Sequence, residues 1–144
     1  MRTILFYAPL GYNMPKSRIG GAEMGCRKTK QVYETAGIKV VTIDKPNSVN
    51  GKILFLVKIL FLPIRIFFLL KFYGTHTPLH IVGFYYSNVN IEVLLMRIAH
   101  FCGNNVIYEP RNGAMIHSYN SGTGTYKRKL ENCFHVQMLS FVRG

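Results

Sequence analysis

The apolar residues of this chain form short continuous runs that alternate with longer segments of helical character. Four runs have the length and the β-branched, apolar composition of buried strands: 3–8, 38–43, 79–84 and 105–109. Three segments between them, and a last one at 126–134, are predicted as helices: 22–36, 52–72 and 91–102. Because each crossover must return the chain to the same end of the sheet, this alternation predicts an α/β domain with a Rossmann-like open parallel sheet and flanking helices.

A pair of glycines, Gly20 and Gly21, joins the first predicted strand to the first predicted helix. Glycine lets the backbone approach a ligand closely, and the helix that follows points unpaired N–H groups and its positive dipole end outward. The pair therefore predicts a site for a phosphate or a carboxylate. The alternative is that the glycines only turn the chain and that Glu23 is an ordinary first-turn acid, favoured by the helix dipole.

Residues 52–72 form an almost continuous apolar stretch of about the length that crosses a bilayer. Lys58 and Arg65 interrupt it, and each central cation costs a spanning helix about 3 kcal/mol, while Pro63 stands near its middle. We expect a helix that lies in the membrane interface with its cations reaching the lipid headgroups: Lys52, Lys58, Arg65 and Lys71. A crossover helix buried largely by its own domain is equally consistent with the pattern, and a true span is less favoured.

The chain is strongly basic, which implies an anionic partner. Of its 144 residues, 18 are Lys or Arg and 6 are Asp or Glu, so the formal net charge is +12. Membrane lipid, a phosphorylated ligand and nucleic acid are the candidates. We expect no nucleic acid, because the basic residues are spread over helices and loops and no RNP-like or zinc-finger signature is present.

The cysteines and the N-terminal residues are typical of a protein of the reducing cytosol. Cys26, Cys102 and Cys133 are odd in number and lie far apart without CxxC spacing, so neither a disulfide framework nor a metal site is predicted. The first apolar run is short and ends at Pro9 and Gly11, which is typical of a strand rather than of a signal peptide. We therefore expect no export, no metal and no cofactor.

Polar residues that can bind an anion or a sugar follow the fourth predicted strand. Arg111 offers a bidentate fork for phosphate or carboxylate, and Asn112 can donate to and accept from a sugar hydroxyl. Glu109 can act as a base or bind a sugar, although a carboxylate simply paired with Arg111 is the favoured alternative, and a solvated arginine before an Asn-Gly turn is another. In a parallel sheet these residues lie at the same edge as Gly20 and Gly21, so we expect one shared cleft.

Dinucleotide binding and the common hydrolytic sites are not supported. Asp44 ends the second predicted strand, where dinucleotide-binding proteins place an acid for the ribose, but their G-x-G-x-x-G motif is absent after the first strand. The chain also lacks a P-loop, an H-E-x-x-H and a G-x-S-x-G pattern. His80, within an apolar run, is predicted to be a strand-end or core histidine.

Taken in order, these segments resemble the N-terminal domain of a family-4 retaining glycosyltransferase with the GT-B fold. The resemblance is carried by the first strand, the long loop that ends in RIGGAE at 18–23, the helix through Gly37 and the second strand. The later segment YEPRNG, at 108–113, is similar to the one that precedes the next helix in bacterial polysaccharide-forming members. The resemblance covers residues 1–131, and residues 132–144 form an atypical tail.

The resemblance implies a function in sugar transfer at the inner face of the cell membrane. The N-terminal domain of that family binds the acceptor, a polysaccharide or a lipid-linked sugar, and its glycine-rich loop faces the diphosphate of the nucleotide-sugar donor. It thus implies that Gly20 and Gly21 contact the donor phosphates, and that Glu109, Arg111 and Asn112 line the acceptor side. It assigns no catalytic base, and it implies an anionic membrane surface as a partner of the basic, apolar stretch.

The resemblance also implies a second domain, which 144 residues cannot hold. In the family that domain binds the nucleotide-sugar and carries an acidic E-x7-E motif. We therefore expect a chain that is inactive alone, either truncated by a shifted reading frame or paired with a separate donor-binding subunit. The competing hypothesis is a non-enzymatic module that binds a membrane surface or a partner through its basic, apolar helix.

Overall fold

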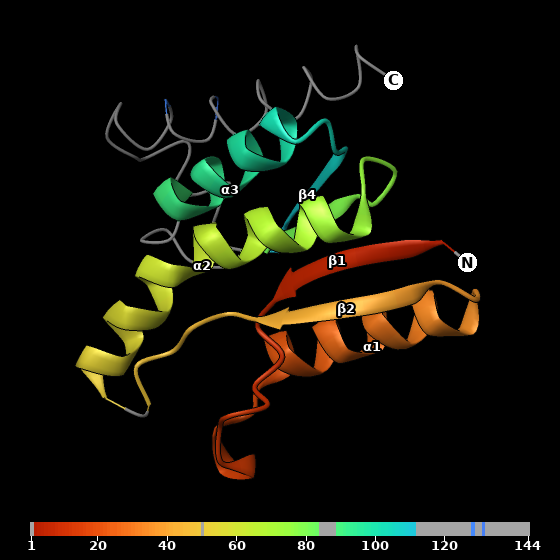
Figure 1. Cartoon of the computed structure of the whole chain (residues 1–144). Coiled ribbons are helices and arrows are strands. Elements are labelled where there is room, and N and C mark those ends of the chain that lie inside the picture. Colours follow the sequence, from red (N-terminus) through yellow and green to blue (C-terminus); the bar gives the residue numbers. More distant parts are fainter. Residues whose placement is uncertain (1, 50, 84–88, 112–127, 129–130, 132–144) are drawn as a thin grey trace.

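The computed structural model describes residues 2–49, 51–83, 89–111, 128 and 131. Its centre is a four-stranded, all-parallel sheet in the order β2-β1-β3-β4 (Figure 1). The strands are β1 (Thr3–Ala8), β2 (Lys39–Asp44), β3 (Leu79–Gly83) and β4 (Val106–Pro110). The predicted α/β class, with a Rossmann-like open parallel sheet, is confirmed. All the loops that follow these strands leave from one edge of the sheet.

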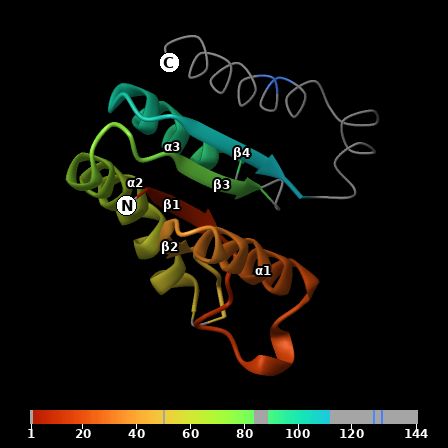
Figure 2. The same cartoon turned by 90° about the vertical axis from the view of Figure 1, so that its right-hand side faces the viewer.

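Helices cover both faces of the sheet (Figures 1 and 2). α1 (Gly21–Thr35) lies on one face, and α2 (Lys52–Tyr73) and α3 (Val89–Phe101) lie on the other. A short 3-10 helix, η1 (Lys16–Arg18), precedes α1. The helix predicted at 126–134 lies mostly outside the described residues. Strands that bury both faces explain why the four apolar runs are continuous rather than alternating.

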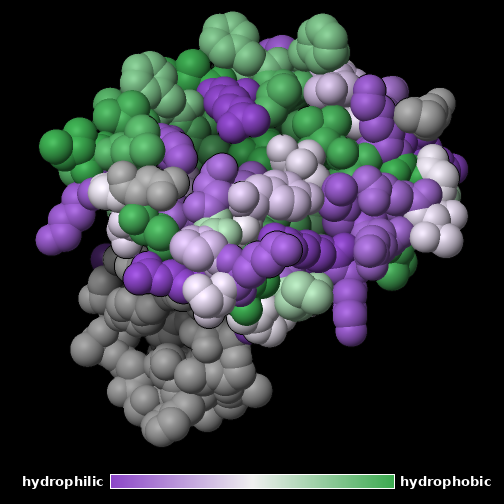
Figure 3. All heavy atoms as spheres, turned by 90° about the horizontal axis from the view of Figure 1, so that it is seen from below, coloured by the Kyte–Doolittle hydropathy of each residue, from purple (hydrophilic) through white to green (hydrophobic). Residues whose placement is uncertain are grey.

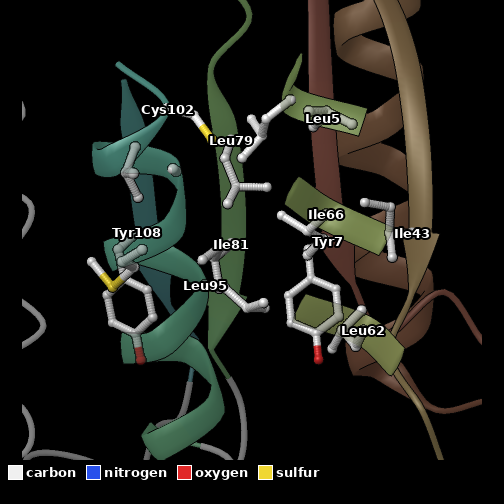
Figure 4. Packing of buried hydrophobic residues seen from close by; sticks show 14 of the residues in the cluster. Leu5, Tyr7, Ile43, Leu62, Ile66, Leu79, Ile81, Leu95, Cys102 and Tyr108 are labelled. Carbon is white, nitrogen blue, oxygen red and sulfur yellow. The ribbon is translucent and has the colours of Figure 1, made fainter. Parts of the chain in front are cut away.

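Successive residues of β1 enter two different cores, because side chains alternate across a strand. Leu5 and Tyr7 face α2 and α3, whereas Phe6 and Ala8 face α1. Figure 4 shows the larger core, where the Tyr7 and Tyr108 hydroxyl groups point toward the carboxyl ends of the strands. Each fully buried Leu or Ile in such a core contributes about 1.5–3 kcal/mol.

α2 packs on the sheet along one narrow stripe. Leu62, Ile66 and Leu70, four residues apart, are buried, and they belong to the core on that face. The helix changes direction between its two halves (Figure 1) near Pro63, whose ring removes a backbone hydrogen bond inside the helix. Its first half, residues 52–61, projects beyond the sheet and is almost wholly exposed.

Most of the apolar surface of α2 is therefore uncovered, although the helix is the crossover between β2 and β3. Figure 3 shows hydrophobic residues gathered along one border of the molecule, beside a hydrophilic area. The exposed large side chains of α2 are Ile53, Leu54, Leu56, Val57, Leu60, Phe61, Ile64, Phe68 and Phe72. Among the described residues α2 is the one helix long and apolar enough to cross a bilayer, with 17% of its most apolar window buried. Length and composition alone are weak grounds for a span, since the core helices of soluble proteins share them.

Candidate functional site

The loop that follows β1 is held at the sheet edge by Asp44, at the end of β2. Its Oδ1 accepts hydrogen bonds from the amides of Leu10 at 2.7 Å and Gly11 at 3.2 Å, and its Oδ2 accepts from Tyr12 at 2.9 Å. Gly11 has φ of 65°, a conformation that favours glycine. The Asp44 carboxylate therefore organises the loop, a role that its position at a strand end did not reveal.

Arg27 of α1 binds the same loop from the other side. Its Nε donates to the carbonyl of Leu10 at 2.8 Å, and its NH2 group donates to that of Gly11 at 3.4 Å. The guanidinium also lies 5.5 Å from the centre of the Tyr12 ring, which is within cation–π range. Together, Asp44 and Arg27 bind both the amides and the carbonyls of the loop, so its shape is set before any ligand arrives.

The two glycines of the predicted phosphate site are exposed at the start of α1. Glu23 Oε2 accepts the amide hydrogen of Gly20 at 2.9 Å, so Glu23 lies in the first turn, as the alternative interpretation held, and also caps the helix, which that interpretation did not predict. The first helical bond runs from Met24 to Gly20, so the preceding three amides, of residues 21–23, make no hydrogen bond within the described chain. A Cβ placed on Gly21 meets nothing within 4 Å. The two glycines are thus exposed, at the end of a helix whose first amides have no hydrogen-bond partner among the described residues.

A charged pair is buried beneath this edge. The Nζ of Lys45 donates to Glu92 Oε1, and the hydroxyl of Tyr108 donates to Glu92 Oε2 at 2.9 Å. The exposed fractions of the Lys45 and Glu92 side chains are 3% and 1%. Burial lowers the pKa of Lys45, and it raises the pKa of Tyr7, whose ring centre lies 5.0 Å from the Lys45 Nζ. Lys45 thus belongs to the core, although it follows the end of β2 and lies outside the helices and strands.

At the end of β4, Glu109 and Arg111 are bound to each other and to buried groups. Arg111 Nε donates to Glu109 Oε1 at 2.5 Å, and the arginine NH2 group donates to Thr29 Oγ1 of α1 at 2.6 Å. The second oxygen of Glu109 lies 3.1 Å from Nε2 of His80, and Nδ1 of His80 lies 2.9 Å from the Tyr33 hydroxyl. The favoured alternative for Glu109, a carboxylate paired with Arg111, is what the structure shows.

His80 is buried in β3, so its prediction as a core or strand-end histidine is confirmed. Burial lowers the pKa of His80 despite the nearby Glu109. A neutral ring with its proton on Nε2 fits both neighbours, because Nε2 then donates to Glu109 and Nδ1 accepts from Tyr33. This chain of contacts ties α1 to β3 and β4.

The β4 end lies close to the first turns of α1. A Cβ placed on Gly25 would stand 3.3 Å from an Arg111 nitrogen, and Gly25 is one helical turn beyond Gly21. Arg111 is thus near the glycine bend, while Asn112 lies outside the described residues. Whether the bend and Arg111 share one ligand stays a prediction, since both the Nε and NH2 groups of Arg111 already have protein partners.

A cleft of about 450 Å³ opens between the end of β2 and α2. Its lining is mainly polar at the strand end and partly apolar along the helix: Tyr12, Asn13, Thr42, Asp44, Lys45, Pro46, Asn47, Lys58, Phe61, Leu62 and Arg65. The four cations predicted to face a membrane therefore differ in position, because Lys58 and Arg65 line this cleft whereas Lys52 and Lys71 do not. No sequence motif marked the cleft, which depends on how far α2 projects beyond the sheet.

The cysteines and acids of the described part of the chain make no metal site. No group of three or more His, Cys, Asp or Glu there is close enough to hold an ion. Cys26 and Cys102 are buried and unpaired with each other, and burial raises the pKa of Cys26 to about 11. A thiol with so high a pKa is a poor nucleophile at neutral pH.

The chemistry available at this edge is that of binding. Asp44, Glu109 and Lys45 are all held by protein partners, whereas the amides of residues 21–23 and the side chains of Lys58 and Arg65 have no hydrogen-bond partner among the described residues. These open groups are donors, and all suit an anion. Comparisons of the chain with protein-family models, curated proteins and solved structures found no match. Its function must therefore be inferred from its own residues and geometry.

Proposed function

We propose that this chain is the N-terminal, acceptor-binding domain of a family-4 retaining glycosyltransferase of the GT-B type. On this proposal it serves an enzyme that moves a sugar from a nucleotide-sugar to a polysaccharide or lipid-linked acceptor, and a separate domain or subunit supplies the donor site. The observation that carries the proposal is the exposed bend at Gly20 and Gly21, at the carboxyl edge of a parallel sheet, followed by three amides that are unbonded within the described part of the chain.

The bend suits a donor phosphate that a facing domain presents. The amides of residues 21–23 and the positive end of a 15-residue helix favour a negative group at this point. The side chain of Glu23 takes the amide of Gly20, so we assign the phosphate contact to Gly21 and the amides after it, with Gly20 allowing close approach. On this proposal Arg111, Glu109 and Asn112 line the acceptor side.

We further propose that the domain works at the cytoplasmic surface of the cell membrane. Nine large apolar side chains on α2 are exposed, and four cations stand on the same helix: Lys52, Lys58, Arg65 and Lys71. An apolar helix surface with interspersed cations binds anionic interfaces through both burial and charge. The buried stripe through Leu62, Ile66 and Leu70 anchors the second half of α2 to the sheet, so the helix lies on the interface rather than across it.

Sugar incorporation by membranes from cells that make the complete system tests the enzymatic proposal. The assay measures the transfer of label from a panel of nucleotide-sugars into lipid and polymer fractions. Gly21→Val is the informative variant, because a Cβ at this position meets no protein atom within 4 Å and the side chain would extend into the open space in front of the bend. We expect it to lower transfer about 100-fold while the thermal unfolding midpoint stays unchanged.

Ala36→Val is the matched control, since it adds bulk at the exposed, opposite end of α1. It should keep full transfer. Wild-type transfer by the Gly21→Val variant would remove the phosphate assignment, and membranes that incorporate sugar equally with and without the chain would remove the enzymatic proposal.

The second candidate function is a non-enzymatic module that binds a membrane surface or a partner. The exposed apolar surface of α2 favours it, because that surface needs a cover whatever the rest of the chain does. On this alternative, Gly21→Val has no effect in cells, and neutralising Lys58 and Arg65 removes the activity of the module.

A further inference from the structure

We infer that the cleft between the end of β2 and α2 is a binding site for the phosphate group of a long-chain lipid. The inference rests on the positions of Lys58 and Arg65, on the polar wall opposite them, and on the apolar surface that begins at Phe61. Lipid binding at this cleft does not depend on sugar transfer, and only the lipid's role as an acceptor rests on the proposed function.

Lys58 and Arg65 lie on one side of α2. They are seven residues apart, which is about two helical turns, and Leu62 between them faces the core. Both side chains line the cleft, and neither makes an ion pair or hydrogen bond in the described part of the chain. Two long cationic side chains at this spacing can converge on one phosphate group between them.

The opposite wall of the cleft offers polar groups without adding a free negative charge. Asn13 and Asn47 supply amide donors, and Tyr12, whose ring lies against Arg27, completes the wall. Asp44 lines the same wall, but its carboxylate already accepts three backbone hydrogen bonds. Lys45 contributes little to a ligand, because its Nζ donates to the buried Glu92.

The apolar end of the cleft identifies the ligand as a lipid. Phe61 lines the cleft and yet is 57% exposed, so it joins the cleft to the uncovered surface of α2. Its neighbours Leu60 and Ile64 are 71% and 52% exposed. A soluble phosphate would use the cations and leave this surface in water, whereas an acyl or isoprenoid chain that leaves the cleft beside Phe61 would cover it.

Vesicle binding with two headgroups of different chemistry tests the inference. The probes are phosphatidylcholine vesicles that contain either phosphatidic acid, a phosphomonoester, or phosphatidylglycerol, a phosphodiester, adjusted to the same surface potential. A phosphomonoester offers three terminal oxygens to Lys58 and Arg65, so we expect wild-type chain to bind the phosphatidic acid vesicles about tenfold more tightly. Equal binding to both kinds of vesicle would overturn the inference that the cleft binds a lipid phosphate, because non-specific attraction of the cations to an anionic surface would then explain the binding.

Two double variants with the same charge change separate the cleft from the rest of the helix. Lys58→Gln with Arg65→Gln should abolish the preference for phosphatidic acid. Lys52→Gln with Lys71→Gln should weaken binding to both kinds of vesicle equally, by about 30-fold or less, and should keep the preference. Loss of the preference in both double variants, or in neither, would overturn the inference. Far-UV circular dichroism and urea unfolding check that each variant folds, and Arg65→Lys should keep part of the preference.

Inorganic phosphate and short-chain phosphatidic acid distinguish the source of the phosphate. We expect the short-chain lipid to shift the NMR signals of Asn13 and Asn47 at concentrations where inorganic phosphate shifts neither. Equal shifts by inorganic phosphate would contradict a lipid ligand. A failure of sugar transfer in the experiment above would leave the headgroup preference intact, so the two proposals fail separately.

Discussion

Replacement of Glu92 by leucine should destabilise the fold more than any surface change, and the loss should depend on pH. Glu92 is fully buried, and its carboxylate accepts hydrogen bonds from Lys45 and Tyr108. Leucine has a similar volume and fits the apolar surroundings, but it leaves the Lys45 ammonium buried without its counter-ion. The variant therefore isolates the electrostatic role of the carboxylate from its packing.

The expected loss follows from the burial of the pair. Removing one partner of a buried ion pair costs about 3–5 kcal/mol, because the other charge stays desolvated. The side chain of Lys45 is 3% exposed, so water cannot replace the lost carboxylate unless the fold opens. Lys45→Met with Glu92→Leu removes both charges, and such replacements are often neutral or stabilising. The double variant should thus recover at least about 2 kcal/mol of the loss.

The loss should shrink as the pH rises. Burial already lowers the pKa of Lys45, and Glu92 is the group that raises it, so the leucine variant lowers that pKa further. A lysine whose pKa is lower when folded than when unfolded binds fewer protons in the folded state, and stability then increases with pH between the two values. The gap between variant and wild type should therefore narrow from about pH 7 to about pH 9.5. Tyr7 does not interfere, because burial raises its pKa.

Urea unfolding followed by circular dichroism measures these differences at each pH. Lys45→Met alone is the reciprocal control, since it leaves the buried Glu92 carboxylate without its counter-ion, and its stability should not recover at high pH. A loss below about 1 kcal/mol for Glu92→Leu, or a double variant no more stable than the single one, would refute a buried charged pair at this position.

Three further predictions concern the sheet edge. Asp44→Asn should lower the free energy of unfolding in urea by about 2 kcal/mol and speed hydrogen exchange at residues 10–12, because a charged acceptor of three amides becomes neutral. Unchanged exchange would contradict the role of Asp44 in holding this loop. Because burial lowers the pKa of His80, the unfolded state binds more protons below about pH 6.5, so wild type should lose stability toward pH 5 and His80→Gln should lose less; parallel pH curves would contradict this. Gly83→Ala should cost about 1–3 kcal/mol, since its Cβ would collide with the Tyr108 hydroxyl, and Tyr108→Phe should relieve part of that cost in the same urea assay.

The elements of the fold were predictable from local patterns. The four strands follow from continuous apolar runs, and the parallel arrangement follows from the helices between them. Glu23 as a cap and Glu109 paired with Arg111 were also within reach, because each pair of partners is only two or three residues apart in sequence. Such features depend on helix and strand geometry that is set by neighbouring residues.

The contacts that shape the site were beyond local patterns. Lys45 and Glu92 are 47 residues apart, and Asp44 binds amides 32 to 34 residues earlier in the chain. In sequence Lys45 looks like any lysine before a proline, and only its contacts with Glu92 of α3 and the ring of Tyr7 place it in the core. The cleft was equally hidden, since it requires the length of α2 and the width of the sheet to be known together.

The half of α2 that projects past the sheet also governs how this protein must be handled. Its six exposed large apolar side chains belong to the folded state itself, so correct folding does not remove their tendency to self-associate. Purification in plain buffer should yield aggregates of native protein, while mild detergent or lipid nanodiscs should yield dispersed particles. The solubility of this domain is then a property of its surroundings as much as of its sequence.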